Sequence, residues 1–399
     1  MMLALTTPSP IPRFILRLRH AVAVVALLAT ATSVSVAAPS LIPAPPQIAA
    51  TAYLLIDADS GRVIVEHNAD ERMPPASLTK IMTSYIAAAE VAAGSVRLDD
   101  QVPISIKAWQ MGGSKMFVRE GTKVSFGDLL HGVVIQSGND ASIAVAEHIA
   151  GSEDAFVDAM NQYAAALGMT NTHFANATGW PAENHHSTAH DLALLTRALI
   201  RDYPEHYALY QQKYYEYNDI NQPNRNKLLW MDDSVDGVKT GYTEEAGYCL
   251  ISSAVRDNMR LIAVVLGADS NRARIRENQK LLTYGFRYYE THRLYAADEP
   301  IRSVEVFGGV SNSVRAGLAS PLYVTIPRGQ YDALEAVTEM HPPLEADIQA
   351  GDALGKLQIT LDGALVASRS LVALDSVEAA GLTKQLWDRM RLLIRRLTG

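Results

Sequence analysis

A change in sequence pattern near Leu294 constrains the fold of this chain more than any other feature. Before it, stretches typical of strands lie at both ends, and segments with the one-face periodicity of helices lie between them. After it, short apolar runs alternate with turns such as Gly308-Gly309 and Asp362-Gly363. The first pattern predicts an α+β domain whose early and late strands meet in one antiparallel sheet flanked by helices. The second predicts a small all-β domain of sandwich type.

Local signals place the elements of both domains. Ala52–Asp57 and Arg62–Glu66 are predicted strands of a hairpin, and a helix is predicted after Pro74-Pro75. The other elements expected in the first domain are a helix capped by Ser125 that runs to about Gln136, a helix from Asp140 to Gly151, a helix capped by Ser187 or Thr188, strands at 235–239, 248–255 and 260–266, and a helix at 271–288. Strands in the second domain are expected at 301–307, 322–326, 353–360 and 364–371.

The first 38 residues have the composition of a secretory signal peptide. Three arginines between positions 13 and 19 precede the apolar run 21–28, which passes into small residues. This run is too short for a membrane-spanning helix, which needs about 20 apolar residues. We therefore expect export with cleavage after Ala37 or Ala38, and an extended, proline-rich leader over residues 39–50.

The charge balance limits the class of partner. With 43 acidic and 35 basic residues the net charge is −8, and loss of the three signal-peptide arginines leaves about −11. Because basic residues gather after Leu382, the rest of the chain is strongly acidic, which argues against nucleic acid as a partner. The single cysteine, Cys249, cannot form an internal disulfide and is predicted to be a buried apolar side chain.

Ser77 and Lys80 form the first motif with chemical potential. They lie three residues apart near the start of a predicted helix, so their side chains share a face and can touch. A lysine amine can act as the base for a serine nucleophile when burial or nearby positive charge lowers its pKa. The first turn of a helix also favours developing negative charge. Alone, this spacing is common and predicts little.

Two further polar motifs follow along the chain. Ser137-Gly138-Asn139 separates two predicted helices, where glycine permits a sharp turn that can present two polar side chains to a cleft. Lys239-Thr240-Gly241 ends a predicted strand with a positive charge, a hydroxyl donor and room for another backbone to approach. The strand edge at that point can pair with an extended peptide. Taken singly, each motif is equally consistent with an ordinary turn or strand end.

In this order, and on a helix, an inter-helix loop and a strand, the three motifs resemble those of class A β-lactamases and penicillin-binding proteins. The chain is most similar to the low-molecular-mass D-alanyl-D-alanine carboxypeptidases. Pro75–Thr83, Ser137–Ala141, Val235–Gly241 and Leu281–Arg287 all look like segments of that family. The resemblance implies a β-lactamase/transpeptidase-like D,D-peptidase catalytic domain at 51–292, a β-sandwich domain at 293–380 and an amphipathic helix at 381–399.

The resemblance also implies a role for each motif residue. Ser77 would form the acyl-enzyme, Lys80 would take its proton, and Ser137 would relay a proton to the leaving D-Ala. No metal or organic cofactor is implied. Many relatives have histidine where this chain has Tyr242, but only the backbone N–H is needed there. Asn139 would bind the amide of the substrate, and Lys239, Thr240 and Arg274 would bind the terminal carboxylate of the substrate. The backbone N–H groups of Ser77 and Tyr242, beside Gly241, would form the oxyanion hole.

The implied activity is that of a serine-type D-Ala-D-Ala carboxypeptidase, which removes the terminal D-Ala from peptidoglycan stem pentapeptides and is inhibited covalently by β-lactams. A class A β-lactamase is disfavoured because no Glu-x-x-Leu-Asn stretch, the source of its deacylating glutamate, is present. A D,D-endopeptidase on peptidoglycan crosslinks would use the same site, and the β domain and tail favour the carboxypeptidase. A penicillin-acylated sensor or scaffold with little turnover is a third interpretation.

Two features lie outside the motifs. His186 and His190 have an i, i+4 spacing, but no third ligand stands at a zinc-site spacing, so capping or surface roles are expected for them and for His185. In 382–397, an apolar stripe that contains Trp387 runs beside basic residues, which predicts a helix bound to a membrane surface. The alternative is a helix packed on its own domain. With the signal peptide, the helix predicts a periplasmic enzyme, peripheral on the outer face of the inner membrane.

Overall fold

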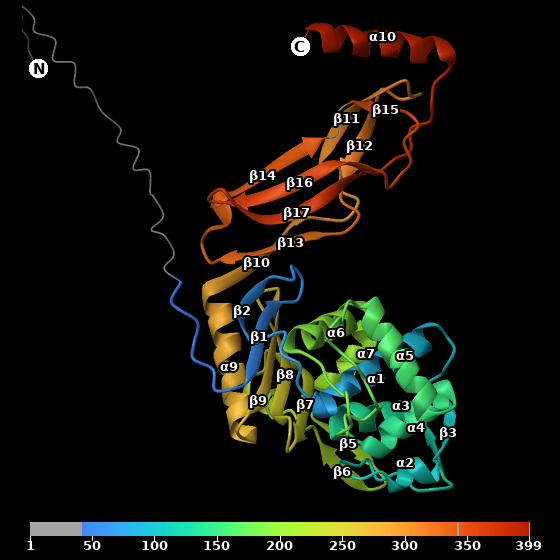
Figure 1. Cartoon of the computed structure of the whole chain (residues 1–399), viewed down its shortest axis with the longest axis vertical. Coiled ribbons are helices and arrows are strands. Elements are labelled where there is room, and N and C mark those ends of the chain that lie inside the picture. Colours follow the sequence, from blue (N-terminus) through green and yellow to red (C-terminus); the bar gives the residue numbers. More distant parts are fainter. Residues whose placement is uncertain (1–41, 341–342, 399) are drawn as a thin grey trace, which may run out of the picture. The chain divides into compact units, whose positions relative to one another are not determined.

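A computed structural model describes residues 42–340 and 343–398 of the chain, except for the side chains of 395–398 (Figure 1). The predicted signal peptide at 1–38 and the predicted cleavage site lie outside the described residues. The described part of the predicted leader, 42–50, contains no helix or strand.

The first domain is built around a five-stranded antiparallel sheet of order β2-β1-β9-β8-β7. The hairpin of β1 and β2 pairs with β9 from the far end of the domain, so the predicted meeting of early and late strands is confirmed. β7 lies at one edge and runs four residues beyond its predicted end. The five strands are β1 (Ala52–Asp57), β2 (Val63–His67), β7 (Val235–Thr243), β8 (Gly247–Arg256) and β9 (Met259–Ala268).

Helices cover both faces of this sheet (Figure 1). α9 (Asn271–Tyr288) packs its apolar residues against one face, and a helical cluster that includes α1 and α6 packs against the other. Cys249 on β8 is fully buried, as predicted. α8 (Leu228–Met231) adds Leu228 and Leu229 to the core on the α9 side. The cluster on the other face contains η1 (Ala76–Thr79), α1 (Lys80–Ala92), α2 (Ile106–Gln110), α3 (Phe126–His131), η2 (Gly132–Gln136), α4 (Asn139–Ala150), α5 (Glu153–Ala166), α6 (Ala189–Asp202), α7 (Pro204–Tyr207) and η3 (Ala208–Gln211), with the short strands β3 (Gln101–Pro103), β4 (Lys123–Ser125), β5 (Tyr214–Tyr217) and β6 (Ile220–Pro223).

The predicted helix ends are confirmed where a cap defines them. The Ser125 side chain accepts the N–H of Asp128 at 3.1 Å, and Thr188 caps α6. α4 ends at Gly151, whose φ of +79° suits glycine. Two helices differ in form from the prediction. The helix after Pro74-Pro75 begins as the 3₁₀ turn η1, and the helix after Ser125 widens into the π-helix η2.

The second domain is all-β, as predicted. Its six-stranded sheet has the order β14-β16-β17-β12-β11-β15, and the pair β10–β13 forms a second layer whose apolar residues pack against it. The predicted boundary between residues 292 and 293 falls inside β10. The strands are β10 (Tyr289–Tyr295), β11 (Arg302–Phe307), β12 (Ser313–Gly317), β13 (Leu322–Pro327), β14 (Leu334–Met340), β15 (Leu344–Glu345), β16 (Ala353–Leu361) and β17 (Ala364–Ala373), with the short helix η4 (Tyr331–Ala333).

The predicted C-terminal helix is present as α10 (Leu382–Thr398). The side of α10 that faces the β domain carries buried Leu392 and the buried Asp388 carboxylate, which accepts the N–H of Gly308 at 2.9 Å, and Arg391 lies 3.3 Å from Glu305. In the described part of the chain, no helix combines the length and apolar content of a membrane span. The apolar residues of α10 are exposed instead: Leu382, Leu386, Trp387, Met390, Leu393 and Ile394.

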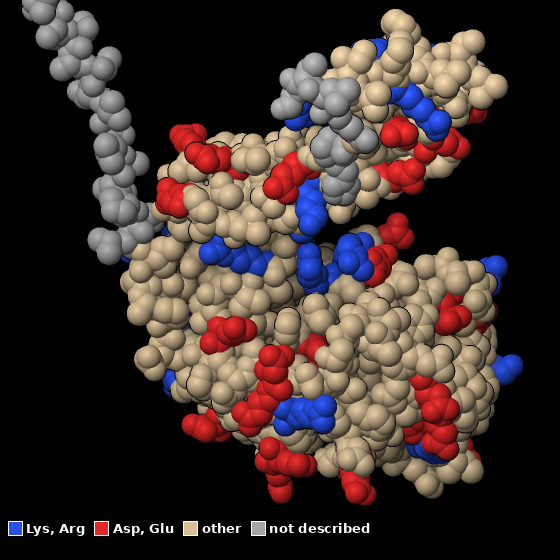
Figure 2. Space-filling model, turned by 45° about the horizontal axis from the view of Figure 1, so that its top comes forward, with Lys and Arg blue, Asp and Glu red and all other residues tan. Residues whose placement is uncertain are grey.

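Charged side chains of both signs occur on the surface. On the face drawn in Figure 2, acidic and basic residues are scattered among larger uncharged areas, and several basic side chains lie close together near the middle. Acidic and basic groups therefore share this face.

Candidate active site

The three predicted motifs come together beside the edge strand β7. Lys80 Nζ donates hydrogen bonds to Ser77 Oγ at 3.1 Å and to Asn139 Oδ1 at 2.6 Å. Lys239 Nζ donates to Ser137 Oγ at 2.8 Å. Side chains from η1, α1, α4 and β7 therefore form one polar cluster.

Lys80 is almost fully buried, with 1 % of its surface exposed. Its third acceptor is the carbonyl of Thr178, at 2.5 Å. Burial lowers the pKa of Lys80 to about 7, although the negative charge of nearby Asp140 acts in the opposite direction. A large fraction of the amine is therefore neutral near pH 7 and can accept the proton of Ser77.

The Ser137-Gly138-Asn139 turn follows from the end of η2. Ser137 takes left-handed angles there, with φ +63° and ψ +36°, and Gly138 leads directly into α4. The Asn139 side chain is fixed at both ends, because Nδ2 donates to the Gly112 carbonyl at 2.7 Å while Oδ1 accepts from Lys80. The turn thus brings both polar side chains to the two lysines.

Lys239 is buried on β7, where it also donates to the Thr240 carbonyl at 3.1 Å. Burial, followed by the positive charges of Lys80, Arg225 and Arg274, lowers the pKa of Lys239 well below its usual value. The lysine and arginine side chains gathered here make binding of an anion favourable. This end of the cluster is therefore suited to a carboxylate.

β7 approaches η1 closely at Gly241. A Cβ atom at this position would lie 3.1 Å from the Pro75 carbonyl oxygen and 3.2 Å from the Ala76 Cβ, so the predicted close backbone approach is confirmed. The Tyr242 side chain that follows is half exposed and packs against Tyr248, with ring centroids 4.4 Å apart and the ring planes tilted by 35°. The aromatic ring thus lies at the surface.

Arg274 lies on α9, behind β7. Its guanidinium donates to the carbonyls of Gly241 at 2.7 Å and Cys249 at 3.1 Å, and its carbon lies 5.5 Å from the centre of the Tyr248 ring. Burial lowers the pKa of Arg274 to about 10, so it is charged at neutral pH. Arg274 braces β7 and adds positive charge near Lys239.

Asp140 was not among the predicted site residues. Its buried carboxylate accepts the N–H groups of Met116 and Phe117 at 2.8 Å and of Val118 at 3.2 Å. It thereby ties the 116–118 loop to the start of α4. Its position next to Asn139 was the available signal, but the loop that it binds lies over twenty residues earlier.

The loop at 175–180 was also not predicted from the sequence to be part of the site. The Asn176 side-chain oxygen accepts the N–H groups of Thr178, Gly179 and Trp180 at 2.8–3.1 Å. Gly179 has φ +81°, and a Cβ atom there would lie 1.8 Å from the Ala76 carbonyl oxygen. The Asn-Ala-Thr-Gly composition predicts a turn but not its place against η1.

A cavity of about 460 Å³ adjoins η1. It opens between the 175–186 loop and the end of β7, and Ala76, the neighbour of Ser77, is part of its wall. Other lining residues include Pro75, Gly179, Trp180, Thr243 and Glu245. An extended molecule lying along β7 would have room on this side of Ser77.

The three histidines have separate surroundings. Buried His185 lies 2.8 Å from the Thr79 hydroxyl through Nε2 and accepts the Ala175 N–H at Nδ1, and burial lowers its pKa to about 4. His190 lies 3.3 Å from exposed Asp70, whereas His186 stacks on His173. His185 therefore serves as a neutral side chain that ties the loop to η1.

Comparison with known proteins decides the family. Residues 40–270 match the family model described as D-alanyl-D-alanine carboxypeptidase. The chain belongs to this family. Residues 289–379 of this carboxypeptidase match the model of the C-terminal domain of penicillin-binding protein 5.

Individual relatives agree with this assignment. The carboxypeptidase is 44% identical over 351 residues to D-alanyl-D-alanine carboxypeptidase DacC of Escherichia coli, which covers 86% of this chain and 88% of the relative. The solved structure of penicillin binding protein 5 from Haemophilus influenzae matches with a TM-score of 0.81 and 41% identity, over 84% of this chain and 99% of that one. Penicillin-binding protein D2 from Listeria monocytogenes, solved in its ampicillin-bound form, matches with a TM-score of 0.57 and 29% identity, over 61% of this chain and all of that one.

Proposed function

We propose that Ser77 is the nucleophile of this carboxypeptidase, and that it removes the terminal D-Ala from peptidoglycan stem pentapeptides through an acyl-enzyme. The observation that carries the proposal is the buried Lys80 amine, 3.1 Å from Ser77 Oγ and with a pKa of about 7. A serine with a neutral amine within hydrogen-bond reach is the arrangement needed for nucleophilic attack.

In the acylation step, Lys80 Nζ takes the proton of Ser77 Oγ as that oxygen bonds to the carbonyl carbon of the penultimate D-Ala. The oxyanion that forms is stabilised by the backbone N–H groups of Ser77 and Tyr242. The C–N bond to the terminal D-Ala then breaks, and the leaving amine receives a proton through Ser137. Water hydrolyses the resulting ester and regenerates Ser77.

Recognition of the free carboxylate falls to the β7 end of the cluster. The terminal carboxylate of the substrate would supply a negative charge beside Lys239 and Arg274, and the Thr240 hydroxyl would donate a hydrogen bond to it. Lys239 already donates to Ser137, which leaves the Ser137 hydroxyl hydrogen free to go to the leaving amine. Binding and leaving-group protonation would thus be linked through one hydrogen bond.

The rest of the stem peptide would lie along β7. This strand is at the edge of the sheet, so its backbone groups can pair with an extended peptide, and the cavity beside η1 leaves room for it. Asn139 would bind the peptide amide. β-Lactams would acylate Ser77 in the same orientation, because their carboxylate and strained amide match the D-Ala-D-Ala end.

Replacement of the nucleophile tests the proposal. Ser77→Ala should abolish D-Ala release from a diacetyl-Lys-D-Ala-D-Ala peptide, a loss of at least about 10³-fold, and should abolish covalent labelling by a fluorescent penicillin. D-Ala release is measured by coupled oxidation and labelling by gel fluorescence. Ser84→Ala, a buried serine on α1, serves as the control.

Retention of D-Ala release by Ser77→Ala would overturn the mechanism. Penicillin labelling without peptide turnover in the unmodified protein would favour the sensor or scaffold interpretation instead. Release of D-Ala only from crosslinked peptidoglycan, and not from linear peptides, would favour the endopeptidase.

We also propose that the protein is exported and that its helix α10 binds the outer surface of the inner membrane. Its polar side is occupied by contacts to the β domain, and its apolar side, including Trp387, faces outward. The alternative, a helix packed on its own domain, holds for the side of α10 that carries Asp388 and Leu392, whereas the apolar stripe stays exposed. Basic residues beside the stripe add attraction to anionic lipid.

A further inference from the structure

The Lys80 amine depends on a backbone carbonyl from an irregular loop. Thr178 supplies this acceptor, at 2.5 Å, and lies in a segment without helix or strand. Catalytic geometry is maintained only when the groups around the reacting side chain are themselves fixed. The position of Lys80 therefore requires something that holds the 176–180 loop.

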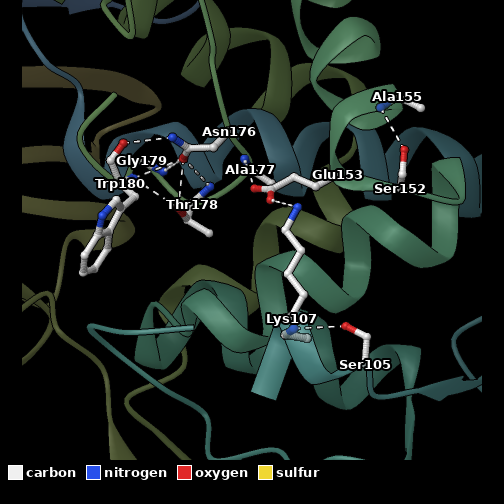
Figure 3. A network of polar contacts seen from close by, with 11 residues as sticks. Ser105, Lys107, Ser152, Glu153, Ala155, Asn176, Ala177, Thr178, Gly179 and Trp180 are labelled. Atoms are coloured by element: carbon white, nitrogen blue, oxygen red, sulfur yellow. Dashed lines mark hydrogen bonds and ion pairs between the residues drawn. The ribbon is translucent and has the colours of Figure 1, made fainter. Parts of the chain in front are cut away.

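Glu153 provides such a support (Figure 3). It lies in the first turn of α5, and its buried side chain points toward the loop, where Oε1 accepts the N–H of Ala177 at 3.0 Å. Its other oxygen lies 2.8 Å from Nζ of Lys107 on α2. Burial of a carboxylate without a partner is costly, and the ion pair with Lys107 offsets part of this cost.

The loop is held at its other end as well. Asn176 binds three successive backbone N–H groups that end at Trp180. The Trp180 ring covers the turn after α2, since a Cβ atom at Gly113 would lie 3.0 Å from it. The neighbouring Gly112 carbonyl holds Asn139. Glu153 and Trp180 thus fix the loop on either side of Thr178.

We propose that Glu153, paired with Lys107, is a positioning residue for Lys80. By fixing Ala177 it holds the Thr178 carbonyl where that carbonyl keeps the amine between Ser77 and Asn139. This inference rests on the proposed role of Lys80 as the base. Glu153 itself acts through the loop and touches none of the reacting atoms.

The proposal predicts a direction for the pH dependence. The Thr178 carbonyl accepts a hydrogen bond from the amine and favours its charged form, so loss of this contact lowers the pKa of Lys80 further. The other ionisable groups near the amine are Asp140, which favours the charged form, and Lys239 and His185. None of these contacts Glu153, so a change at Glu153 leaves them in place.

The test compares Glu153→Ala with Glu153→Gln. Acylation by a fluorescent penicillin is followed from pH 5 to pH 9. Each rate is divided by the concentration of active sites, which is determined by titration with the same penicillin. Glu153→Ala should acylate about tenfold more slowly, with the acid limb of its profile displaced to lower pH. Glu153→Gln should stay within about twofold, because an amide oxygen can still accept the Ala177 N–H. Asp154→Ala, the exposed neighbouring acid, should match the unmodified enzyme.

Three outcomes would overturn the inference: unmodified behaviour of Glu153→Ala, equal impairment of Glu153→Ala and Glu153→Gln, or a slower rate without displacement of the acid limb. The last marks a purely structural role. If Glu153→Ala does not fold, Lys107→Met replaces it, with an expected two- to threefold loss and the same displacement.

Lys80→Ala in the same assay separates the two proposals. If this variant acylates and turns over normally, the proposed role of Lys80 fails. If Lys80 is required and Glu153→Ala is unaffected, only the positioning role fails.

Discussion

At the scale of single residues, the site is organised around the buried amine of Lys80. Lys80 has three acceptors, namely Ser77, Asn139 and the Thr178 carbonyl, and only the first is a reactant in the proposed mechanism. Burial lowers the pKa of Lys80 while Asp140 raises it, and the balance leaves the value near 7. Because the neutral amine is the base in the proposed mechanism, acylation should become faster as pH rises through this value.

Asp140→Asn tests this balance. Removal of the negative charge takes away the interaction that raises the pKa of Lys80, so the acid limb of penicillin acylation should move from about pH 7 to lower pH. The amide would also point a donor toward N–H groups of the 116–118 loop, which should reduce the stability by about 2 kcal/mol. Stopped-flow acylation and thermal unfolding measure the two effects.

A matched control is Glu147→Gln, two turns further along α4. It should leave both the acid limb and the melting temperature unchanged. An acid limb of Asp140→Asn that coincides with that of the unmodified enzyme would show that Asp140 does not set the pKa of Lys80.

Sequence spacing predicted the Ser77–Lys80 contact because both residues belong to one short segment whose geometry is local. The Thr178 carbonyl could not be predicted in this way, since a backbone group has no residue-specific signal. The contact of Asp140 with the 116–118 loop depends on tertiary structure, including a left-handed Phe117 with φ +70°. Roles that depend on distant chain segments therefore stayed hidden.

At the scale of elements, periodicity and caps predicted the central sheet and most of the helices. β10 was missed because Tyr289–Tyr295 is largely polar and does not alternate with period two. α5 was missed although Ser152 and two acidic residues form a readable start signal. The π-helix η2 has no sequence pattern that distinguishes it from an α-helix, so the turn at Ser137 could be expected only from Gly138.

The contact between the 175–180 loop and η1 makes a prediction at this scale. Gly179→Ala would place a Cβ atom 1.8 Å from the Ala76 carbonyl oxygen at a φ of +81°, so the loop or η1 must move. We expect a stability loss of about 3 kcal/mol or more, and at least tenfold slower acylation because Ser77 follows Ala76 directly. Denaturant unfolding and penicillin labelling measure these changes.

Gly94→Ala is the matched control. Its φ of +73° is similar, but nothing lies within 4 Å of the added atom. Gly94→Ala should lower the free energy of unfolding by only about 1 kcal/mol and leave the acylation rate unchanged. Equal effects of the two substitutions would mean that backbone conformation, and not the close contact, governs Gly179.

At the scale of the whole molecule, the sequence predicted the order of an α+β domain, an all-β domain and a terminal helix, because each has its own residue pattern. It could not predict which side of α10 faces the β domain. The answer depends on Asp388, a single acidic residue in a basic segment, which is buried against Gly308. The apolar stripe is consequently left on the outside.

The exposed stripe leads to a membrane prediction. Combined replacement of Leu386, Trp387 and Leu393 by glutamine should reduce binding to vesicles with about one third anionic lipid at least tenfold. D-Ala release from a soluble peptide should be unchanged. Co-sedimentation with the vesicles and the peptide assay give the two readouts.

Thr383→Gln, on the exposed surface of the same helix, should bind vesicles like the unmodified protein. If the triple variant still sediments with vesicles, the membrane contact lies elsewhere in the chain. High salt should weaken the binding of the unmodified protein only in part, because burial of apolar surface is insensitive to screening.

The contact of Asp388 with Gly308, together with the ion pair of Arg391 and Glu305, has a consequence for how such an enzyme would sit at a bilayer. A helix on a free linker would act as a tether and let the attached domain tumble. A helix docked on the β domain by its own polar side would instead transmit the plane of the lipid surface to that domain. Attachment to the membrane would then restrict the rotation of the β domain as well as its diffusion. The β domain would therefore face the peptidoglycan in a preferred orientation.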